Sequence, residues 1–135
     1  MKDVICLEKQ KLIDMAISVQ KNSYAPYSGI TVGAVLLTAD NKVFLGCNVE
    51  NASYGASICA ERTAILKAVS EGERNFDTIA ITSNLEDFIY PCGICLQVMA
   101  EFAPKLKIII TNKSNEIINT TVSDLLPKGF ILISD

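Results

Sequence analysis

The sequence contains no histidine among its 135 residues. Catalysis by a Ser-His-Asp triad or by a Cys-His pair is therefore excluded, and any bound metal must be held by Cys, Asp or Glu. A group that transfers protons must in turn be a carboxylate, a lysine, a tyrosine or a thiol. Metal binding and proton transfer thus fall to a few types of side chain.

The sequence also lacks long apolar runs, a secretory leader and an excess of basic residues. No apolar stretch approaches the roughly 20 residues of a membrane helix, and the first residues, MKDV, do not resemble a signal peptide. A net charge of −3 and a pI near 4.9 argue against binding to a nucleic-acid backbone. We expect one domain over residues 1–135 that acts on a small substrate, with neither a membrane nor a nucleic-acid partner.

Cysteine is present in an odd number, five, at spacings that are not those of a disulfide framework. This usage predicts a reducing, cytoplasmic compartment, where a C-x-x-C pair more often binds metal or does redox work. Cys59 lies in the segment SICAER (57–62), and Cys92 and Cys95 lie in YPCGIC (90–95). Three thiolates can hold one Zn²⁺ and leave its fourth position open, as in a catalytic site. Glu61, two residues after Cys59, is the best-placed proton shuttle.

The spacing of these residues constrains how they meet. Cys59 and Glu61 would point in nearly opposite directions along the side of a helix. Both can serve one site only if the helix directs its N-terminal end at that site, and the pair behind Pro91 repeats the arrangement. Since three thiolates on Zn²⁺ leave excess negative charge, first-turn amides would help to withdraw it. Arg62 either bonds a ligand sulfur for the same purpose or is an ordinary surface arginine.

Periodicity and turn signals predict an α-β-β-α-β-α-β-β order, a sheet with helices packed against it. We expect helices at 7–22, 58–71 and 92–102, with a helical turn at 123–127. Strands are expected at 31–38, 43–49, 76–83, 107–111 and 116–122. The apolar tail at 129–134 is expected to pack on something. Strand alternation puts Asn48 and Glu50 on one face, and the local sequence favours a polar strand end facing water.

Several linked segments resemble the cytidine deaminase family in its short, zinc-dependent, usually homotetrameric form. They are YAPYS (24–28), VGA (32–34), GCNVENASY (46–54), CAERTA (59–64) and PCGIC (91–95). The resemblance implies an α/β/α sandwich on a five-stranded mixed sheet, a nucleoside substrate bound in pockets that are shared between the subunits of a homotetramer, and one Zn²⁺ per subunit.

The resemblance also implies roles for individual residues. Cys59, Cys92 and Cys95 would bind zinc, with Glu61 as the proton shuttle. Asn48 and Glu50 would hold the ribose hydroxyl, and the Ala60 amide would bind the carbonyl oxygen of the base. Tyr54 and Phe130 match aromatic positions that neighbouring subunits lend to the pocket. Glu61 would protonate N3, zinc-bound hydroxide would attack C4 of cytosine, and ammonia would leave to give uridine or deoxyuridine.

Two positions depart from the family pattern. Leu96 stands where relatives usually carry Arg after the second cysteine of the pair. Ile30 stands where many relatives carry a Phe that stacks on the base, and Ile offers apolar contact without an aromatic face. Both positions bear on substrate preference more than on the type of reaction.

Other hypotheses are a deaminase of a modified cytosine nucleoside, such as blasticidin S, and a non-catalytic module stabilised by zinc. The module gives no reason for Glu61 beside Cys59. A thioredoxin-like role for Cys92 and Cys95 would need neither zinc nor a third cysteine. A measurement of metal content would distinguish the redox hypothesis from the zinc-dependent ones. A measurement of activity would distinguish the non-catalytic module from the deaminases.

Overall fold

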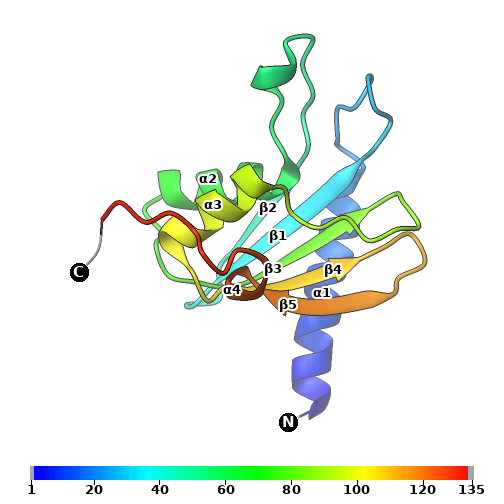
Figure 1. Cartoon of the computed structure of the whole chain (residues 1–135). Coiled ribbons are helices and arrows are strands. Elements are labelled where there is room, and N and C mark those ends of the chain that lie inside the picture. The colour runs from blue at the N-terminus through cyan, green and yellow to red at the C-terminus, as the bar shows by residue number, and fades with distance from the viewer. Residues whose placement is uncertain (1, 134–135) are drawn as a thin grey trace.

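The structure is a computed structural model that describes residues 2–133. Its sheet has five strands in the order β2-β1-β3-β4-β5 (Figure 1). Only β3 and β4 pair in parallel, so the sheet is mixed. The strands are β1 (Val32–Thr38), β2 (Val43–Cys47), β3 (Phe76–Ser83), β4 (Lys107–Thr111) and β5 (Ile117–Thr121). The helices are α1 (Lys2–Gln20), α2 (Ala60–Ser70), α3 (Gly93–Phe102), α4 (Val122–Leu125) and the 3₁₀ turn η1 (Tyr54–Ala56).

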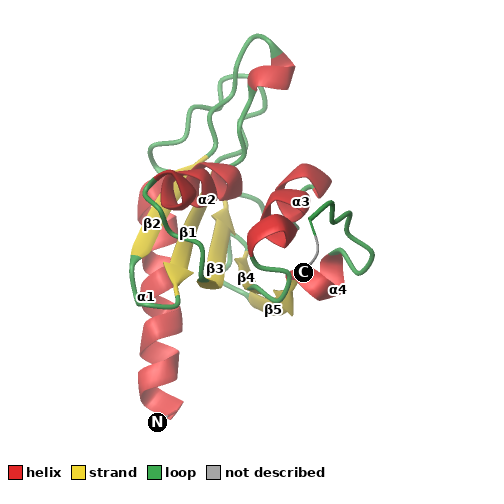
Figure 2. Cartoon of the chain, turned by 90° about the vertical axis from the view of Figure 1, so that its left-hand side faces the viewer, coloured by secondary structure: helices red, strands yellow, loops and turns green. Residues whose placement is uncertain are grey.

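Helices cover both faces of the sheet, as Figure 2 shows. On one face α1 buries Leu12, Ile13 and Ala16 against alternate residues of the strands, among them Val35 and Ala80. The opposite face holds the larger core, in which α2, α3 and α4 pack on the other set of strand residues. Because strand side chains alternate between faces, the two clusters do not mix. The expected α/β/α sandwich on a five-stranded mixed sheet is confirmed.

The segments that carry the predicted site lie together at one end of the strands. Both neighbours of β1 run antiparallel to it, so β2 and β3 end beside the start of β1. Cys47 pairs with Gly33 there, and Ser83 pairs with Val32. An arm of residues 48–58, which includes η1, extends from this end of the strands next to the loop of residues 21–31 (Figure 1).

The boundaries differ from the expected ones in a few places. Helix α1 begins at Lys2 rather than at residue 7, because no Gly or Pro interrupts residues 2–7. Helices α2 and α3 begin after their cysteines, since Cys59 and Cys92 have extended backbones with ψ of 154° and 165°. The 3₁₀ turn η1 was not predicted.

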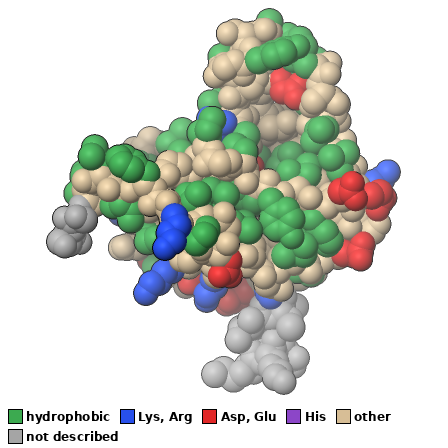
Figure 3. Space-filling model, in the orientation of Figure 1, with side chains coloured by type: hydrophobic (Ala, Val, Ile, Leu, Met, Phe, Trp, Pro, Cys, Tyr) green, Lys and Arg blue, Asp and Glu red, His purple; other side chains and the backbone are tan. Residues whose placement is uncertain are grey.

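The apolar tail, of which residues 129–133 are described, does not bury its large side chains against its own chain. Phe130, Leu132 and Ile133 are 69%, 80% and 78% exposed. Figure 3 shows hydrophobic side chains along this terminal segment. Within one chain, therefore, the tail's side chains stay at the surface. Among the described helices, none is both long and apolar enough to cross a membrane.

Candidate active site

Three cysteines from two helix N-termini form one cluster. The Sγ atoms of Cys59, Cys92 and Cys95 all lie within 4.8 Å of one another. Cys59 is the N-cap of α2, and Cys92 is the N-cap of α3. The two helices thus point their N-terminal amides and the positive ends of their dipoles toward the same sulfur atoms. This convergence of two helix N-termini, predicted from spacing, is confirmed.

The cluster has dimensions that suit zinc. The Sγ atoms of Cys59 and Cys92 are 3.8 Å apart. Two sulfurs bound to one tetrahedral zinc at the usual Zn–S length of about 2.3 Å would be separated by about 3.8 Å. Soft thiolates are also the ligands that zinc prefers. The residues present therefore fit Zn²⁺ with three protein ligands and room for a fourth.

A close approach of β2 to α2 fixes where Cys59 lies. Gly46, in β2, sits directly against the first turn of the helix. A Cβ atom there would lie 2.5 Å from the Ala60 carbonyl oxygen and 2.6 Å from the Ala64 nitrogen. Only glycine leaves room for this packing without a shift of backbone. The position of Cys59 thus depends on a residue that bears no functional group.

Arg62 bridges two of the three sulfurs. Its Nε donates to Cys95 Sγ and its Nη2 donates to Cys59 Sγ, each at 3.4 Å. These bonds, that to Cys59 first, raise the pKa of the guanidinium above its usual range. The planar fork of arginine allows two acceptors to be held at once. The sulfur-bonded alternative for Arg62 is therefore correct, and the free surface arginine is wrong.

The thiols of the cluster share protons unequally. The pKa of Cys59 is lowered, because Cys95 and then Arg62 hydrogen-bond to its sulfur. The pKa of Cys95 is raised by that same interaction and by burial. Without metal, Cys59 thus ionises more readily than Cys95, at the sulfur that the α2 N-terminus faces.

Glu61 is a buried carboxyl group in the first turn of α2. It is 5% exposed, and burial raises its pKa to about 7, with the nearby Cys59 adding to the effect. Both salt bridges found among the described side chains belong to Lys42, so neither pairs with Glu61. A carboxyl group poised near neutral pH can both accept and release a proton.

Asn48 and Glu50 hold the loop of residues 21–31 rather than facing water. Asn48 donates through Nδ2 to the Ile30 carbonyl at 2.8 Å and accepts from the Val32 amide at 2.9 Å. Glu50 accepts from the amides of Tyr27 and Ser28 at 3.0 and 3.2 Å and from the Ser28 hydroxyl. Asn48 is therefore not a solvated strand end, whereas Glu50 holds the loop and is still half-exposed.

The hydroxyl of Ser28 is a link that sequence reasoning missed. It donates to Glu50 and accepts from the Ile30 amide at 3.0 Å. The hydrogen bond from the Ser28 hydroxyl lowers the pKa of Glu50 most, and the bonds from the amides of Tyr27 and Ser28 lower it further. The carboxyl group is therefore ionised at neutral pH. Its only sequence signal was its place in the YAPYS segment.

A cleft lies between this loop and the arm. It is lined by Tyr27, Ser28, Glu50, Asn51, Tyr54 and Ser57. Tyr54 lies on η1, is 78% exposed and meets the Tyr27 ring edge-on, with the centroids 6.1 Å apart. Figure 3 shows the surface hollowed below the arm. The arm therefore carries Tyr54 beside Glu50, while most of its ring remains free.

The remaining predicted residues lie around this region. Ala60 is fully buried as the first residue of α2. Ile30 is half-buried against the larger core. Phe130 is outside the residues that line the cleft; its carbonyl accepts a bond of 2.6 Å from Gln97 on α3. Phe130 is thus tied to the helix of Cys92 through its backbone, and its ring is exposed.

Leu96, which stands where relatives usually carry arginine, is a core residue. It is 7% exposed and belongs to the larger core. An apolar neighbourhood therefore surrounds this position, and Arg62 is the cation that contacts the cluster.

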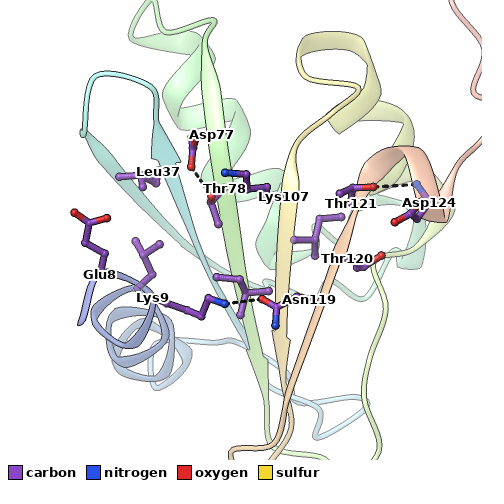
Figure 4. Close-up of a pocket in the computed structure, with 13 residues that line it drawn as sticks. Glu8, Lys9, Leu37, Asp77, Thr78, Lys107, Asn119, Thr120, Thr121 and Asp124 are labelled. Atoms are coloured by element: carbon purple, nitrogen blue, oxygen red, sulfur yellow. Dashed lines mark hydrogen bonds between the residues drawn. The ribbon is translucent and has the colours of Figure 1, made fainter. Parts of the chain in front are cut away.

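A second hollow lies on the α1 face of the sheet (Figure 4). Acidic and basic side chains alternate around it: Glu8, Lys9, Asp77, Lys107 and Asp124. In Figure 4, Lys9 from α1 reaches Asn119 on β5, and their hydrogen bond measures 2.9 Å. No cysteine lines this hollow. The cysteine cluster therefore lies away from this hollow.

Comparisons with known proteins give a consistent picture. The model of the family described as "Cytidine and deoxycytidylate deaminase zinc-binding region" matches residues 7–111, a range that contains all three clustered cysteines. Cytidine deaminase of Halalkalibacterium halodurans is 46% identical over 125 residues, or 92% of this chain and 95% of that protein.

The chain also resembles a solved cytidine deaminase structure and the sequence of a deaminase with a different named substrate. The crystal structure of cytidine deaminase from Burkholderia pseudomallei superposes with a TM-score of 0.87 at 47% identity, covering 90% of this chain and 98% of that one. Blasticidin-S deaminase of Bacillus cereus is 30% identical over 104 residues, or 71% of this chain and 74% of that protein.

Proposed function

The chain belongs to the cytidine and deoxycytidylate deaminase family, and we propose that it deaminates cytidine and deoxycytidine by hydrolysis. Water replaces the amino group at C4 of the base, which gives uridine or deoxyuridine and ammonia. The reaction returns pyrimidine nucleosides to salvage. Identity of 46% over nearly the whole chain to a cytidine deaminase supports this substrate class.

The observation that carries the proposal is the buried carboxyl group beside the cysteine cluster. Zinc held by Cys59, Cys92 and Cys95 would supply the activation of a water molecule. Glu61 would accept a proton from that water and pass it to N3 of the base. Once the hydroxyl has added to C4, Glu61 would accept the proton of that hydroxyl and deliver it to the amino group, which would leave as ammonia while the C4 carbonyl forms. Its pKa near 7 suits a group that must do both. A metal site of purely structural use would need no such carboxyl group.

The electrostatics of the cluster support catalysis rather than mere metal storage. Three thiolates on Zn²⁺ carry excess negative charge, which weakens its action on water. Arg62 and the two helix N-termini counter that charge at the sulfur atoms. We assign Arg62 this supporting role.

We assign substrate binding to residues near the start of β1 and the end of β2 and to the N-terminus of α2. The ionised Glu50 and the amide of Asn48 would hold a ribose hydroxyl, since each keeps hydrogen-bonding capacity beyond its bonds to the loop. The Ala60 amide, at the unbonded N-terminus of α2, would bind the carbonyl oxygen of the base. Ile30 would give the base an apolar contact.

The exposed aromatic residues support a shared pocket. Tyr54 and Phe130 expose 78% and 69% of their surfaces, and the apolar tail is uncovered in the single chain. A homotetramer in which these side chains complete neighbouring pockets would bury them. Free thiols in the cluster suit a reducing, cytoplasmic location.

The test is ammonia release from cytidine and deoxycytidine by the wild type and by Glu61→Gln, with zinc quantified in both. We expect activity in the wild type, a loss of at least a thousandfold in the variant, and equal zinc. An inactive wild type with full zinc occupancy would refute cytidine deamination. Sedimentation would test the tetramer independently.

A second candidate is deamination of a modified cytosine nucleoside. The match to blasticidin-S deaminase and the aliphatic Ile30 favour including it. Comparison of kcat/KM for cytidine and blasticidin S decides between them. Because Asn48 and Glu50 both lie at the ribose end, we expect cytidine to be preferred.

A further inference from the structure

The start of β1 runs between two asparagine side chains, only one of which has been assigned a role. Asn48 follows β2 on one side, and Asn84 follows β3 on the other. Both strands are antiparallel to β1, so the residues that follow them lie beside the segment that precedes it. This segment, residues 29–31, joins the loop of Ser28 to the sheet.

Asn84 bonds the segment in the manner of a strand. Its Nδ2 donates to the Gly29 carbonyl at 2.9 Å, and its Oδ1 accepts from the Thr31 amide at 3.1 Å. Its own amide donates to the Thr31 carbonyl at 3.2 Å. Three backbone groups on both sides of Ile30 are thus held from the β3 side, beyond the last residue of the strand.

Asn48 holds the complementary groups. It bonds the Ile30 carbonyl and the Val32 amide from the β2 side. The remaining Ile30 amide donates to Ser28, whose hydroxyl donates in turn to Glu50. The backbone around Ile30 is therefore fixed on both sides, and the fixed segment leads directly into the Ser28–Glu50 contact.

The cysteine cluster does not depend on the Asn84 side chain. The loop from β3 to Cys92 has anchors of its own: the Leu85 carbonyl accepts from the Lys113 amide at 2.8 Å, and the Glu86 carbonyl accepts from Asn112 at 2.8 Å. Asn112 is 4% exposed and receives two further backbone bonds. Loss of the Asn84 amide therefore disturbs the residue 29–31 segment without releasing Cys92.

We propose that Asn84 is a positioning residue for nucleoside binding. It holds the backbone on which Ile30 and Ser28 lie and so sets where the base and ribose contacts stand relative to the zinc cluster. The proposal rests on the proposed deaminase function. It predicts an effect on substrate affinity that is separable from the effect on chemistry, because Glu61 and the cysteines lie on other elements.

The test compares Asn84→Ala with Asn75→Ala. Asn75 is also exposed but precedes β3, at the opposite end of the same strand. For Asn84→Ala we expect KM for cytidine to rise roughly tenfold, as the loss of two side-chain hydrogen bonds allows, with kcat within about threefold and zinc unchanged. Exchange of the Thr31 amide hydrogen should become faster. Asn75→Ala should match the wild type in all four measurements.

The outcomes are distinguishable. A wild type without activity refutes the deaminase function itself. An active wild type with an unchanged KM in Asn84→Ala refutes the positioning role, and so does a fall in kcat at constant KM, which indicates loss of active protein only. If Asn84→Ala does not fold, Asn84→Asp replaces it, because it keeps the acceptor for Thr31 and loses the donor to Gly29. Its KM should rise as well, and an unchanged value overturns the proposal.

Discussion

Gly46 offers a test of how the fold places a zinc ligand. In Gly46→Ala, the new Cβ would stand 2.5 Å from the Ala60 carbonyl oxygen, 2.6 Å from the Ala64 nitrogen and 3.0 Å from Thr63 Cβ. Two of these three atoms belong to helix backbone and cannot rotate away. Relief therefore requires the first turn of α2 to move from β2 by several tenths of an ångström.

The displacement has two measurable consequences. Forcing a methyl group into a packed contact costs typically about 1–3 kcal/mol of unfolding free energy. For a chain of this length, that corresponds to a fall in Tm of roughly 4–12 °C. Cys59 caps the same turn, and metal ligands tolerate errors of only about 0.2 Å. We therefore expect zinc affinity to fall by about 10–100-fold, the range seen when a ligand's supporting contact is lost.

The assay is competition for zinc with a chromogenic chelator, together with thermal unfolding. Gly55→Ala is the matched control, because a Cβ at Gly55 meets no atom within 4 Å. We expect the control to keep wild-type zinc affinity. If Gly46→Ala binds zinc as tightly as Gly55→Ala does, the contact between β2 and α2 does not set the position of Cys59.

Three further predictions concern the site. Arg62→Lys should lower kcat by about 10–100-fold while the protein stays folded, because one ammonium group cannot reproduce the two-nitrogen bridge between Cys59 and Cys95; steady-state kinetics with Tm as control measure this. Ser28→Ala should raise KM by about tenfold, because Glu50 loses a hydroxyl donor, and an unchanged KM would contradict the link. Removal of zinc by a chelator should abolish activity, and mass spectrometry should then find that Cys95, which is buried and has a raised pKa, is the last of the three clustered cysteines to be alkylated.

The cysteine cluster could be predicted because its signal is local. Cys59 and Glu61 are two residues apart, and Cys92 and Cys95 are three apart, so helix geometry alone limits how each pair can point. The absence of histidine further reduced the types of residue that could bind a metal. The strands could be predicted as well, since their β-branched runs are short and bounded by turns.

The loop contacts could not be predicted because they join residues distant in sequence. Asn84 meets Gly29 across 55 residues, and Glu50 meets Ser28 across 22. Side-chain amides that bond backbone leave no periodicity in the sequence, so neither Asn84 nor Ser28 was singled out. For this same reason, the local sequence did not indicate the bonds of Asn48 and Glu50 to the loop. The exposed tail presents a related difficulty, because only the proposed homotetramer would supply a surface that covers it.

Leu96 and Arg62 together explain how this chain balances the charge of its metal site. With Leu96 turned into the core, no cation follows Cys95 along α3. Arg62 contacts the sulfurs of both Cys59 and Cys95, one ligand from each helix, and it does so from the helix that also carries Glu61. One side chain thus withdraws charge from two ligands while lying next in sequence to the proposed proton shuttle. Substitution of Arg62 should consequently be felt more strongly here than in a relative with a second arginine at the cluster.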